Sequence, residues 1–246
     1  MKTRLYISCI FTLLVLFSCK KENLCDCFKG TGKPGSEIRD LRNFTRINME
    51  DKVDVYFYQS TDSSYEVKVE AGKHLLKLVK TNVVNGELQI RNDNKCGFMR
   101  SYKKEKIIIH VKAPHLYYIT NNAVGNFYSA TTITGDTLEY DIKNSGDINL
   151  DVNCYKVLGH MHGAGDVTLT GSVFNHSVSS VGQSFIKAES LVAAYTFIYY
   201  NASGEAKVNV TGQLDAEIHG SGNVYYTGNP GTVSAKVSGK GRLIAF

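Results

Sequence analysis

Apolar and polar residues alternate over most of the chain from about residue 117 to the C-terminus. The alternation is broken seven times by a small residue, a glycine and a polar residue. The glycines are Gly125, Gly146, Gly165, Gly182, Gly204, Gly222 and Gly241, separated by 21, 19, 17, 22, 18 and 19 residues. A period near nineteen residues is typical of a solenoid, in which short structural units stack along one axis.

Alignment on these glycines gives columns that are mostly apolar at two and four residues after each glycine and at four and eight residues before it. The last column includes Tyr117, Phe174 and Val233. Because the offsets are even, each unit predicts a strand, a glycine corner and a second strand, with one face of each strand buried. Stacking the units buries that face, and seven units at about 4.8 Å each form a column roughly 34 Å tall. The pattern predicts an all-β, right-handed parallel β-helix.

The glycine at each corner is expected because a sharp turn between strands favours a positive φ or the lack of a Cβ atom. The residue after each glycine is polar and is expected to face water. These residues are Asn126, Asp147, Asp166, Gln183, Glu205, Asn223 and Arg242.

Residues 44 to 112 predict a less regular β region that continues into the repeats as one domain over residues 44–246. Alternating apolar residues predict strands around Val55, Val67, Leu88 and Ile109. Asn85-Gly86 predicts a hairpin turn. Residues 74 to 81 are expected to form about two helical turns.

The N-terminus has the pattern of an export signal, in which Lys2 and Arg4 precede an apolar run from Leu5 to Phe17. Thirteen apolar residues are too few to span a bilayer. Residues 1–18 resemble a bacterial lipoprotein signal, and by that resemblance Cys19 is lipidated; ordinary cleavage elsewhere is the alternative. Residues 19–43 hold several glycines without periodicity and are expected to be a flexible tether.

Composition argues against a nucleic-acid partner. Removal of the two basic residues in the signal lowers the formal net charge from +5 to +3, and no large basic cluster is present. The chain after Cys19 has four cysteines, Cys25, Cys27, Cys96 and Cys154, which allow three disulfide connectivities in an oxidising compartment. Pairing of Cys25 or Cys27 with Cys96 is favoured, with Cys154 free. A zinc site lacks a second ligand pair of suitable spacing.

Several sequence features together carry a resemblance to a known family. They are the lipoprotein-like signal, Phe44-Thr45-Arg46-Ile47, Val53-Asp54-Val55, Tyr65-Glu66-Val67 and the repeat exemplified by Ser221-Gly222-Asn223. In their order along residues 44–246 they resemble the head GIN domain family of putative autotransporter adhesins. The resemblance implies a right-handed β-helix in a Bacteroidetes-like cell envelope and supplies no catalytic motif.

The repeats contain no recognisable nucleophile or phosphate-binding motif, so no cofactor and no enzymatic activity are expected. Outward-facing His160 and His162 near Asp141 suggest a metal site, but solvated histidines are the simpler interpretation. Stacked Asp147 and Asp166 suggest calcium, although aspartate at a corner more often binds the turn backbone. His176 is expected in the core.

The most promising ligand surface comprises Phe197, Tyr199, Asn175, Ser177, Asp215 and Glu217. The alternation turns Phe197 and Tyr199 outward. Alignment on the glycines places Asn175 and Ser177 one rung below them, and Asp215 and Glu217 one rung above. An aromatic platform with polar neighbours suits a sugar. The two carboxylates, about 6.6 Å apart, also approach the spacing of an inverting glycosidase.

Three classes of function therefore remain open. The first is a noncatalytic, lipid-anchored envelope protein, expected at the outer membrane, that presents a β-helix surface to a glycan or a protein. The second is a polysaccharide-active enzyme, which rests on analogy with other β-helices. The third is a structural or regulatory envelope component that contacts neighbouring subunits, including further copies of itself.

Overall fold

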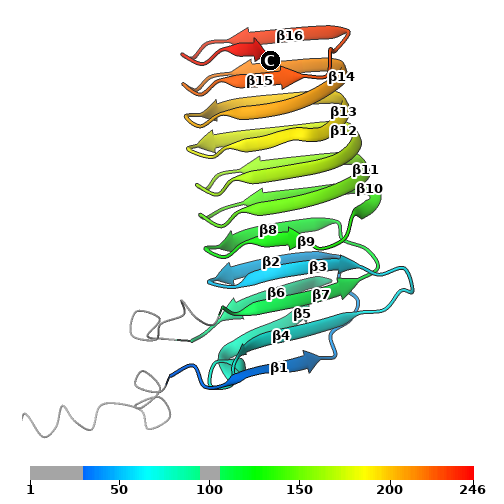
Figure 1. Cartoon of the computed structure of the whole chain (residues 1–246), viewed down its shortest axis with the longest axis vertical. Coiled ribbons are helices and arrows are strands. Elements are labelled where there is room, and N and C mark those ends of the chain that lie inside the picture. The colour runs from blue at the N-terminus through cyan, green and yellow to red at the C-terminus, as the bar shows by residue number, and fades with distance from the viewer. Residues whose placement is uncertain (1–29, 95–105) are drawn as a thin grey trace, which may run out of the picture.

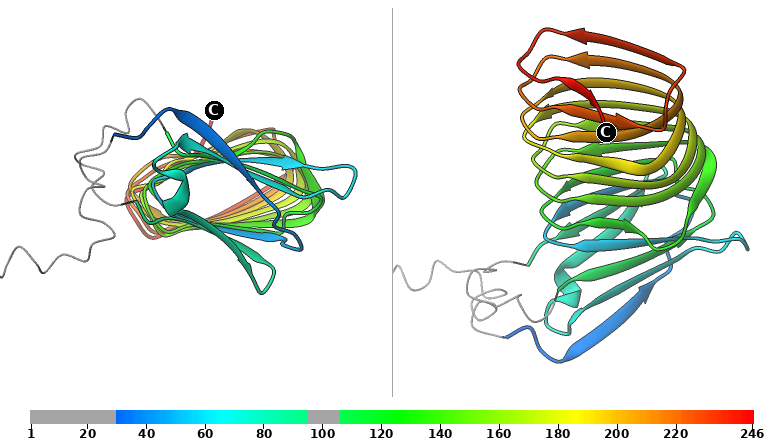
Figure 2. Two further views of the ribbon diagram at one scale, coloured as in Figure 1. Left: turned by 90° about the horizontal axis from the view of Figure 1, so that it is seen from below. Right: turned by 45° about the horizontal axis from the view of Figure 1, so that its top comes forward.

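The computed structural model describes residues 30–94 and 106–246, which form a β-solenoid of about seven turns on a curled, mixed N-terminal sheet. Figure 1 shows the rungs stacked from β8 up to β16 and β17, with β1 at the opposite end. Viewed along the stack, the rungs enclose a flattened cross-section (Figure 2). The all-β solenoid prediction is confirmed.

The solenoid strands follow one another along the chain and pair in parallel with their equivalents in the next rung. Their bounds are β8 (Tyr118–Ala123), β9 (Phe127–Ser129), β10 (Ile133–Ile142), β11 (Ile148–Met161), β12 (Val167–Gly182), β13 (Ile186–Ala202), β14 (Ala206–Ile218), β15 (Val224–Thr227), β16 (Thr232–Val237) and β17 (Leu243–Ala245). Strand β11 pairs with β12, β12 with β13 and β13 with β14. The inward residues of successive rungs form one continuous apolar core.

The corner glycines are required because the backbones of neighbouring rungs approach closely there. A Cβ atom added to Gly222 would lie 1.8 Å from the carbonyl oxygen of Gly204, and one added to Gly165 would lie 2.1 Å from that of Gly146. Among the seven predicted corner glycines only Gly182 has a positive φ. The lack of a Cβ atom therefore explains the column, and a positive φ is the wrong explanation for the other six.

The register places Ser184, rather than Gly182, at the fourth corner. Val167 pairs with Ile186, so Gly165 lies below Ser184, and the carbonyl oxygen of Ser184 in turn lies beneath Gly204. The predicted steps of 17 and 22 residues thereby become 19 and 20. Gly182 belongs to the neighbouring column, where it pairs with Ala202.

This shift of two residues corrects two further expectations for the same rung. The residue after the corner is Phe185, which is exposed, and not Gln183. Phe174, placed among the inward positions, is 53% exposed, and His176 occupies the buried position between Val157 and Thr196. At the two ends of the column, Tyr117 and Val233 are also exposed.

Side chains next to the corners form a hydrogen-bonded ladder along the solenoid. The backbone N–H of Asn126 donates to Asp54 Oδ1 (3.0 Å), that of Asp147 to Asn126 Oδ1 (3.0 Å), and that of Asp166 to Asp147 Oδ1 (2.8 Å). The series continues from Phe185 N–H to Asp166 Oδ1 (2.9 Å). Each side chain therefore satisfies a backbone amide of the following rung, which supports the interpretation of these aspartates as turn-binding residues.

The N-terminal region consists of β1 (Pro34–Arg39), β2 (Arg46–Asp51), β3 (Asp54–Gln59), β4 (Glu66–Gly72), a 3-10 turn (Leu76–Leu78), β5 (Val79–Val84), β6 (Glu87–Asn92) and β7 (Ile108–Ala113). Strands β2 and β3 pair in parallel with β8 and β9, so the stacking continues into this region. The pairs β1–β4, β4–β7 and β5–β6 are antiparallel. The predicted strands and the hairpin at Asn85-Gly86 are confirmed, with both residues at positive φ.

Two expectations for this region are wrong. The predicted helix over residues 74–81 is only one 3-10 turn, because Val79 already begins the β5–β6 hairpin. Residues Pro34–Arg39 of the expected tether form β1, an exposed edge strand without a buried face that alternation could reveal. Arg39 anchors it by donating hydrogen bonds to the carbonyl oxygens of Leu76 (3.1 Å) and Val79 (2.7 Å).

Cys154 is a buried free thiol, as expected. The predictions for Cys19, Cys25, Cys27 and Cys96 fall outside the described residues.

Gly222→Ala should lower the free energy of unfolding by about 1 to 3 kcal/mol, because the new methyl group would overlap the carbonyl of Gly204. Gly135→Ala is the matched control, since a Cβ atom there meets nothing within 4 Å. Denaturant unfolding of both variants measures the difference. Equal stabilities would contradict the close-approach explanation.

Candidate functional site

Three aromatic side chains project from alternate positions of β13. Tyr195, Phe197 and Tyr199 are half-buried and lie between fully buried residues such as Ile198. The outward direction predicted for Phe197 and Tyr199 is therefore confirmed. We refer to Tyr195, Phe197 and Tyr199 as the β13 aromatic row.

The rungs above and below the β13 aromatic row supply polar neighbours. Asp215 pairs with Phe197 and Glu217 with Tyr199, as the sequence predicted. On the lower side Ser177 lies beneath Phe197 and Ser179 beneath Tyr199, whereas Asn175 lies beneath Tyr195. The sequence alignment placed Asn175 under Phe197 and Ser177 under Tyr199, which is wrong by two residues because of the misassigned corner.

Hydrogen bonds already hold both carboxylates of this surface. Tyr195 OH and Gln213 Nε2 donate to Asp215 Oδ2 at 2.9 and 2.8 Å. The hydrogen bond to Asp215, followed by burial, raises the pKa of Tyr195 above its ordinary value. The ring of Tyr195 is thereby fixed in position.

Glu217 Oε2 lies 3.4 Å from Nε2 of His219, whose Nδ1 lies 2.7 Å from Ser238 Oγ. The His219 ring also packs against Tyr199, with centroids 4.9 Å apart. These contacts extend the aromatic surface from β13 to the corner after β14. Together they give a surface of rings with fixed hydrogen-bonding groups at its margin.

Sequence reasoning missed Tyr195 and a second aromatic group. Tyr155 and Phe174 stack one above the other at the opposite corner of the solenoid, with centroids 5.0 Å apart and an interplanar angle of 6°. They are 61% and 53% exposed. The two residues are 19 positions apart, which is one repeat, and this spacing could have predicted that they stack. Because Gly182 was assigned to the corner in place of Ser184, the alignment placed Phe174 at an inward position.

The N-terminal sheet carries a third group, in which His110 lies between two tyrosines. Its ring centroid is 5.7 Å from that of Tyr56 and 5.9 Å from that of Tyr58. Glu70, at 3.5 Å from His110, and Tyr58 line an open hollow of about 570 Å³. Its other charged side chains are Glu66 and Lys68 on β4 and Lys112 on β7; because both signs are present, the hollow indicates no single ligand chemistry.

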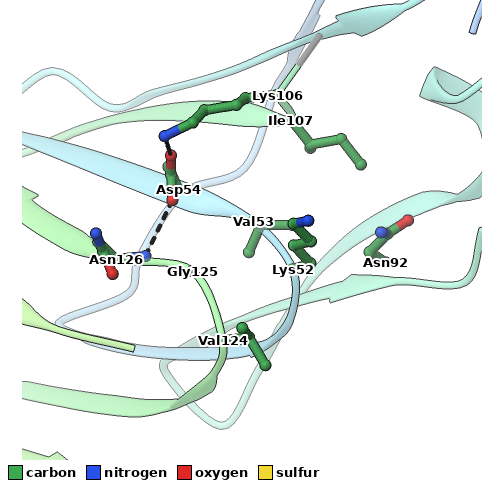
Figure 3. Close-up of a pocket in the computed structure, with 9 residues that line it drawn as sticks. All are labelled: Lys52, Val53, Asp54, Asn92, Lys106, Ile107, Val124, Gly125 and Asn126. Atoms are coloured by element: carbon green, nitrogen blue, oxygen red, sulfur yellow. Dashed lines mark hydrogen bonds and ion pairs between the residues drawn. The ribbon is translucent and has the colours of Figure 1, made fainter. Parts of the chain in front are cut away.

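A smaller hollow of about 170 Å³ lies at the junction between the N-terminal sheet and the first corner (Figure 3). Its buried carboxylate, Asp54, contacts Lys106 Nζ at 3.0 Å and accepts the backbone N–H of Asn126 at 3.0 Å. Asp54 is thus the first acceptor of the corner ladder. The carboxylate serves the stacking of the rungs, and this hollow is a weak candidate for chemistry.

The suggested metal sites do not gain support from the geometry. His160 Nε2 lies 3.4 Å from Glu139 Oε1, Asp141 contacts Lys143 at 3.3 Å, and His162 is exposed. Asp147 and Asp166 hold backbone amides in the ladder. Within residues 30–94 and 106–246, no three His, Cys, Asp or Glu residues are grouped to hold a metal ion.

His176 is buried as expected, but its Nε2 has no hydrogen-bond partner, and neither has Oγ1 of Thr196 in the next rung. Burial lowers the pKa of His176 from 6.5 to about 4. The imidazole is therefore neutral at neutral pH and is a core group rather than a ligand-binding one.

The fold defines a β-solenoid protein whose outer faces carry several aromatic groups. The chain belongs to the family described as "Putative auto-transporter adhesin, head GIN domain", which matches residues 43–230. The family expected from the sequence is therefore confirmed. No curated protein sequence matches the chain.

Solved structures share the fold. A putative adhesin from Bacteroides fragilis is 24% identical, with a TM-score of 0.81, and the match covers 89% of this chain and 100% of the other. A putative adhesin from Parabacteroides distasonis is 20% identical, with a TM-score of 0.64 and coverage of 87% and 98%. A putative lipid binding protein from the same species is 23% identical, with a TM-score of 0.64 and coverage of 89% and 100%.

His176 should make the protein less stable in acid. Its folded pKa of about 4 is below the unfolded value near 6.5, so the unfolded state binds the proton first and stability falls as pH decreases through this window. The loss should reach roughly 3 kcal/mol. In His176→Leu this component should vanish, whereas His162→Leu, at an exposed histidine, should behave like the parent. Denaturant unfolding from pH 7.5 to pH 4 tests this, and parallel curves for His176→Leu and the parent would contradict it.

Proposed function

We propose that the protein is a noncatalytic, lipid-anchored cell-envelope module that binds a glycan on the β13 aromatic row. The observation that carries the proposal is the row itself: three outward aromatic rings at alternate positions of one strand, with polar side chains on both flanking strands. A sugar can stack its apolar CH face on such rings while its hydroxyl groups bond to the polar margin.

Family membership supports this proposal at a coarser level. An adhesin needs a rigid, accessible surface, and a parallel β-solenoid supplies one because its inner strands, including β13, are paired on both sides. The side chains of the row need little ordering on binding, since tyrosine and phenylalanine have few rotatable bonds and Tyr195 and Tyr199 are already held. A protein partner at the same surface, including a second copy, is the competing occupant.

The arrangement of the carboxylates favours binding over glycoside hydrolysis. Asp215 accepts two hydrogen bonds on one oxygen, and Glu217 pairs with His219. Hydrolysis needs two carboxylates that flank the scissile bond from opposite sides. Asp215 and Glu217 instead project from the same face of β14, so they suit hydrogen bonds to one side of a sugar.

Attachment to the envelope through Cys19, with residues 1–18 as the signal, rests on the sequence pattern alone. No helix in the described residues is long and apolar enough to cross a membrane. An acylated Cys19 would hold the solenoid at the outer membrane, facing either the periplasm or the outside. The cell envelope is also where an adhesin of this family would act.

The parent protein, without residues 1–18, is first screened on a glycan array. Replacement of Phe197 and Tyr199 by alanine should abolish binding to every glycan that the parent binds. Stability should change by no more than about 1 kcal/mol, because the rings lie outside the core. The matched control is Tyr155→Ala with Phe174→Ala, which removes two rings from the opposite corner. Loss of binding only in the Tyr155→Ala, Phe174→Ala variant would place the glycan site at that corner. The absence of glycan binding by the parent protein would refute the proposed glycan-binding function.

Cys19→Ser should release the protein from the membrane fraction into the soluble fraction, because acyl chains provide the proposed attachment. The control is Cys154→Ser, which changes a cysteine in the buried core and should leave the distribution unchanged. Cell fractionation followed by immunoblotting measures both variants. A Cys19→Ser variant that remains in membranes would show a different attachment.

A further inference from the structure

The two long edges of the β13 aromatic row differ in their hydrogen-bonding groups. Figure 1 shows β13 between β12 and β14. The edge on β14 carries Asp215 and Glu217, and the edge on β12 carries Ser177 and Ser179. An ionised carboxylate only accepts hydrogen bonds, whereas a hydroxyl group both donates and accepts them. A ligand on the row therefore meets only acceptors at these two positions of β14.

Each of these carboxylates keeps one oxygen available to a ligand. Asp215 Oδ2 accepts hydrogen bonds from Tyr195 OH and Gln213 Nε2, and no described residue donates one to Oδ1. Glu217 Oε2 lies 3.4 Å from His219 Nε2, and Oε1 has no partner in the described part of the chain. Neither free oxygen is buried. Each of them can therefore accept a hydrogen bond from a bound molecule.

The lysines on this face lie farther from the row than the carboxylates do. Lys156 on β11 is two rungs below Tyr195, and Lys236 on β16 is two rungs above Tyr199, with Lys240 after it in the same rung. At about 4.8 Å per rung, these strands are roughly 10 Å from β13, whereas β14 is roughly 5 Å away. Exposed charges are screened over about 8 Å at physiological salt, so the carboxylates dominate the potential at the row.

The two carboxylates are not neutralised by these lysines. Among the described residues, Glu217 forms an ion pair with His219 and none with Lys236, and Asp215 forms no ion pair. The imidazole of His219 adds a positive charge only when it is protonated. With neutral imidazole, the edge on β14 therefore presents two negative charges beside the rings.

We propose that the β13 aromatic row accepts neutral glycans and rejects acidic ones. This inference rests on the glycan-binding function proposed above. A neutral sugar that stacks on Phe197 and Tyr199 can donate hydroxyl hydrogens to Asp215 Oδ1 and Glu217 Oε1. A uronic or sialic acid would bring a further carboxylate, which supplies no donor and is repelled by the like charges on β14.

The test uses a glycan array that carries neutral, uronic-acid and sialylated oligosaccharides. Cellohexaose and mannohexaose are printed beside the same hexasaccharides after oxidation of their primary hydroxyl groups to carboxylates. The protein without residues 1–18 is applied at pH 8, where imidazole groups are mostly neutral. It should retain neutral glycans at least roughly tenfold more strongly than their oxidised forms. Added salt should reduce this difference, because it screens the repulsion.

Asp215→Asn with Glu217→Gln removes both charges at nearly constant side-chain shape. The amide oxygen of the new asparagine can still accept the hydrogen bond from Tyr195. This double variant should retain the oxidised glycans about as strongly as the neutral ones, because the repulsion is gone. Array retention of the parent and the variant measures the gain.

Glu139→Gln is the matched control for the change at position 217. Glu139 lies on the same face, three rungs below Phe197, and its Oε1 is 3.4 Å from His160 Nε2, the same separation as in the Glu217–His219 pair. The control variant should discriminate against oxidised glycans as the parent does.

Equal retention of neutral and oxidised glycans by the parent would overturn this inference and leave the glycan-binding function in place. So would retention of acidic glycans that is lost in the Phe197→Ala, Tyr199→Ala variant, or unchanged discrimination in the Asp215→Asn, Glu217→Gln variant. Retention of no glycan at all would instead refute the function itself. Should the double variant fail to fold, Glu217→Gln alone must narrow the difference, and an unchanged difference would overturn the inference.

Discussion

The close contact between the backbones of successive rungs at the corner is the constraint on which the solenoid depends. At Gly222 or Gly165 the carbonyl of the rung below occupies the space of a Cβ atom. Strands on both sides of the corner can then pair in register, and their inward side chains meet in one core. The polar ladder beside the corner adds contacts wherever a rung supplies an acceptor side chain at that height, as Asn126, Asp147 and Asp166 do; Phe185 does not, and the ladder is interrupted there.

The sequence revealed the period and the inward faces. An error of two residues in the register of an alternating strand leaves the same side chains facing inward, so the prediction of the faces tolerates such an error. Assignment of the fourth corner to Gly182 moved one rung by two residues, which left Phe197 and Tyr199 correctly outside and His176 correctly inside. The same error put Asn175 and Ser177 beneath the wrong partners. Which residues lie above one another in successive rungs depends on the register of strand pairing. That register is fixed by backbone contacts at the corner, and Ser184 occupies such a corner as well as glycine does elsewhere. A glycine in a nearby column was therefore a misleading marker.

The N-terminal sheet was harder to predict, since its strands are determined more by pairing with distant strands than by the local pattern of apolar residues. Val79 has a helical spacing with Leu75, but it is the first residue of β5, which pairs with β6 across the turn at Asn85-Gly86. Strand β1 has almost no buried side chain, so it shows no alternation and is defined by its pairing with β4. Of the candidate surface, the direction of two rings was predictable. The fixation of Tyr195 by Asp215 was not, because Asp215 lies above Phe197 and Tyr195 lies beneath Gln213, so this hydrogen bond depends on side-chain conformation and not on register alone.

The corner ladder has the same polarity wherever it is seen. From Asp54 through Asn126, Asp147 and Asp166, and again from Asn223 to Arg242, the side chain of the earlier rung accepts an amide of the later one. A rung that forms later in the chain thus docks on acceptors that are already in place, while in the reverse order the finished rung would present backbone amides whose acceptors had not yet formed. For a chain that leaves the ribosome or crosses a membrane with its N-terminus first, this polarity matches the direction of emergence, and the stack can grow one turn at a time on a finished template.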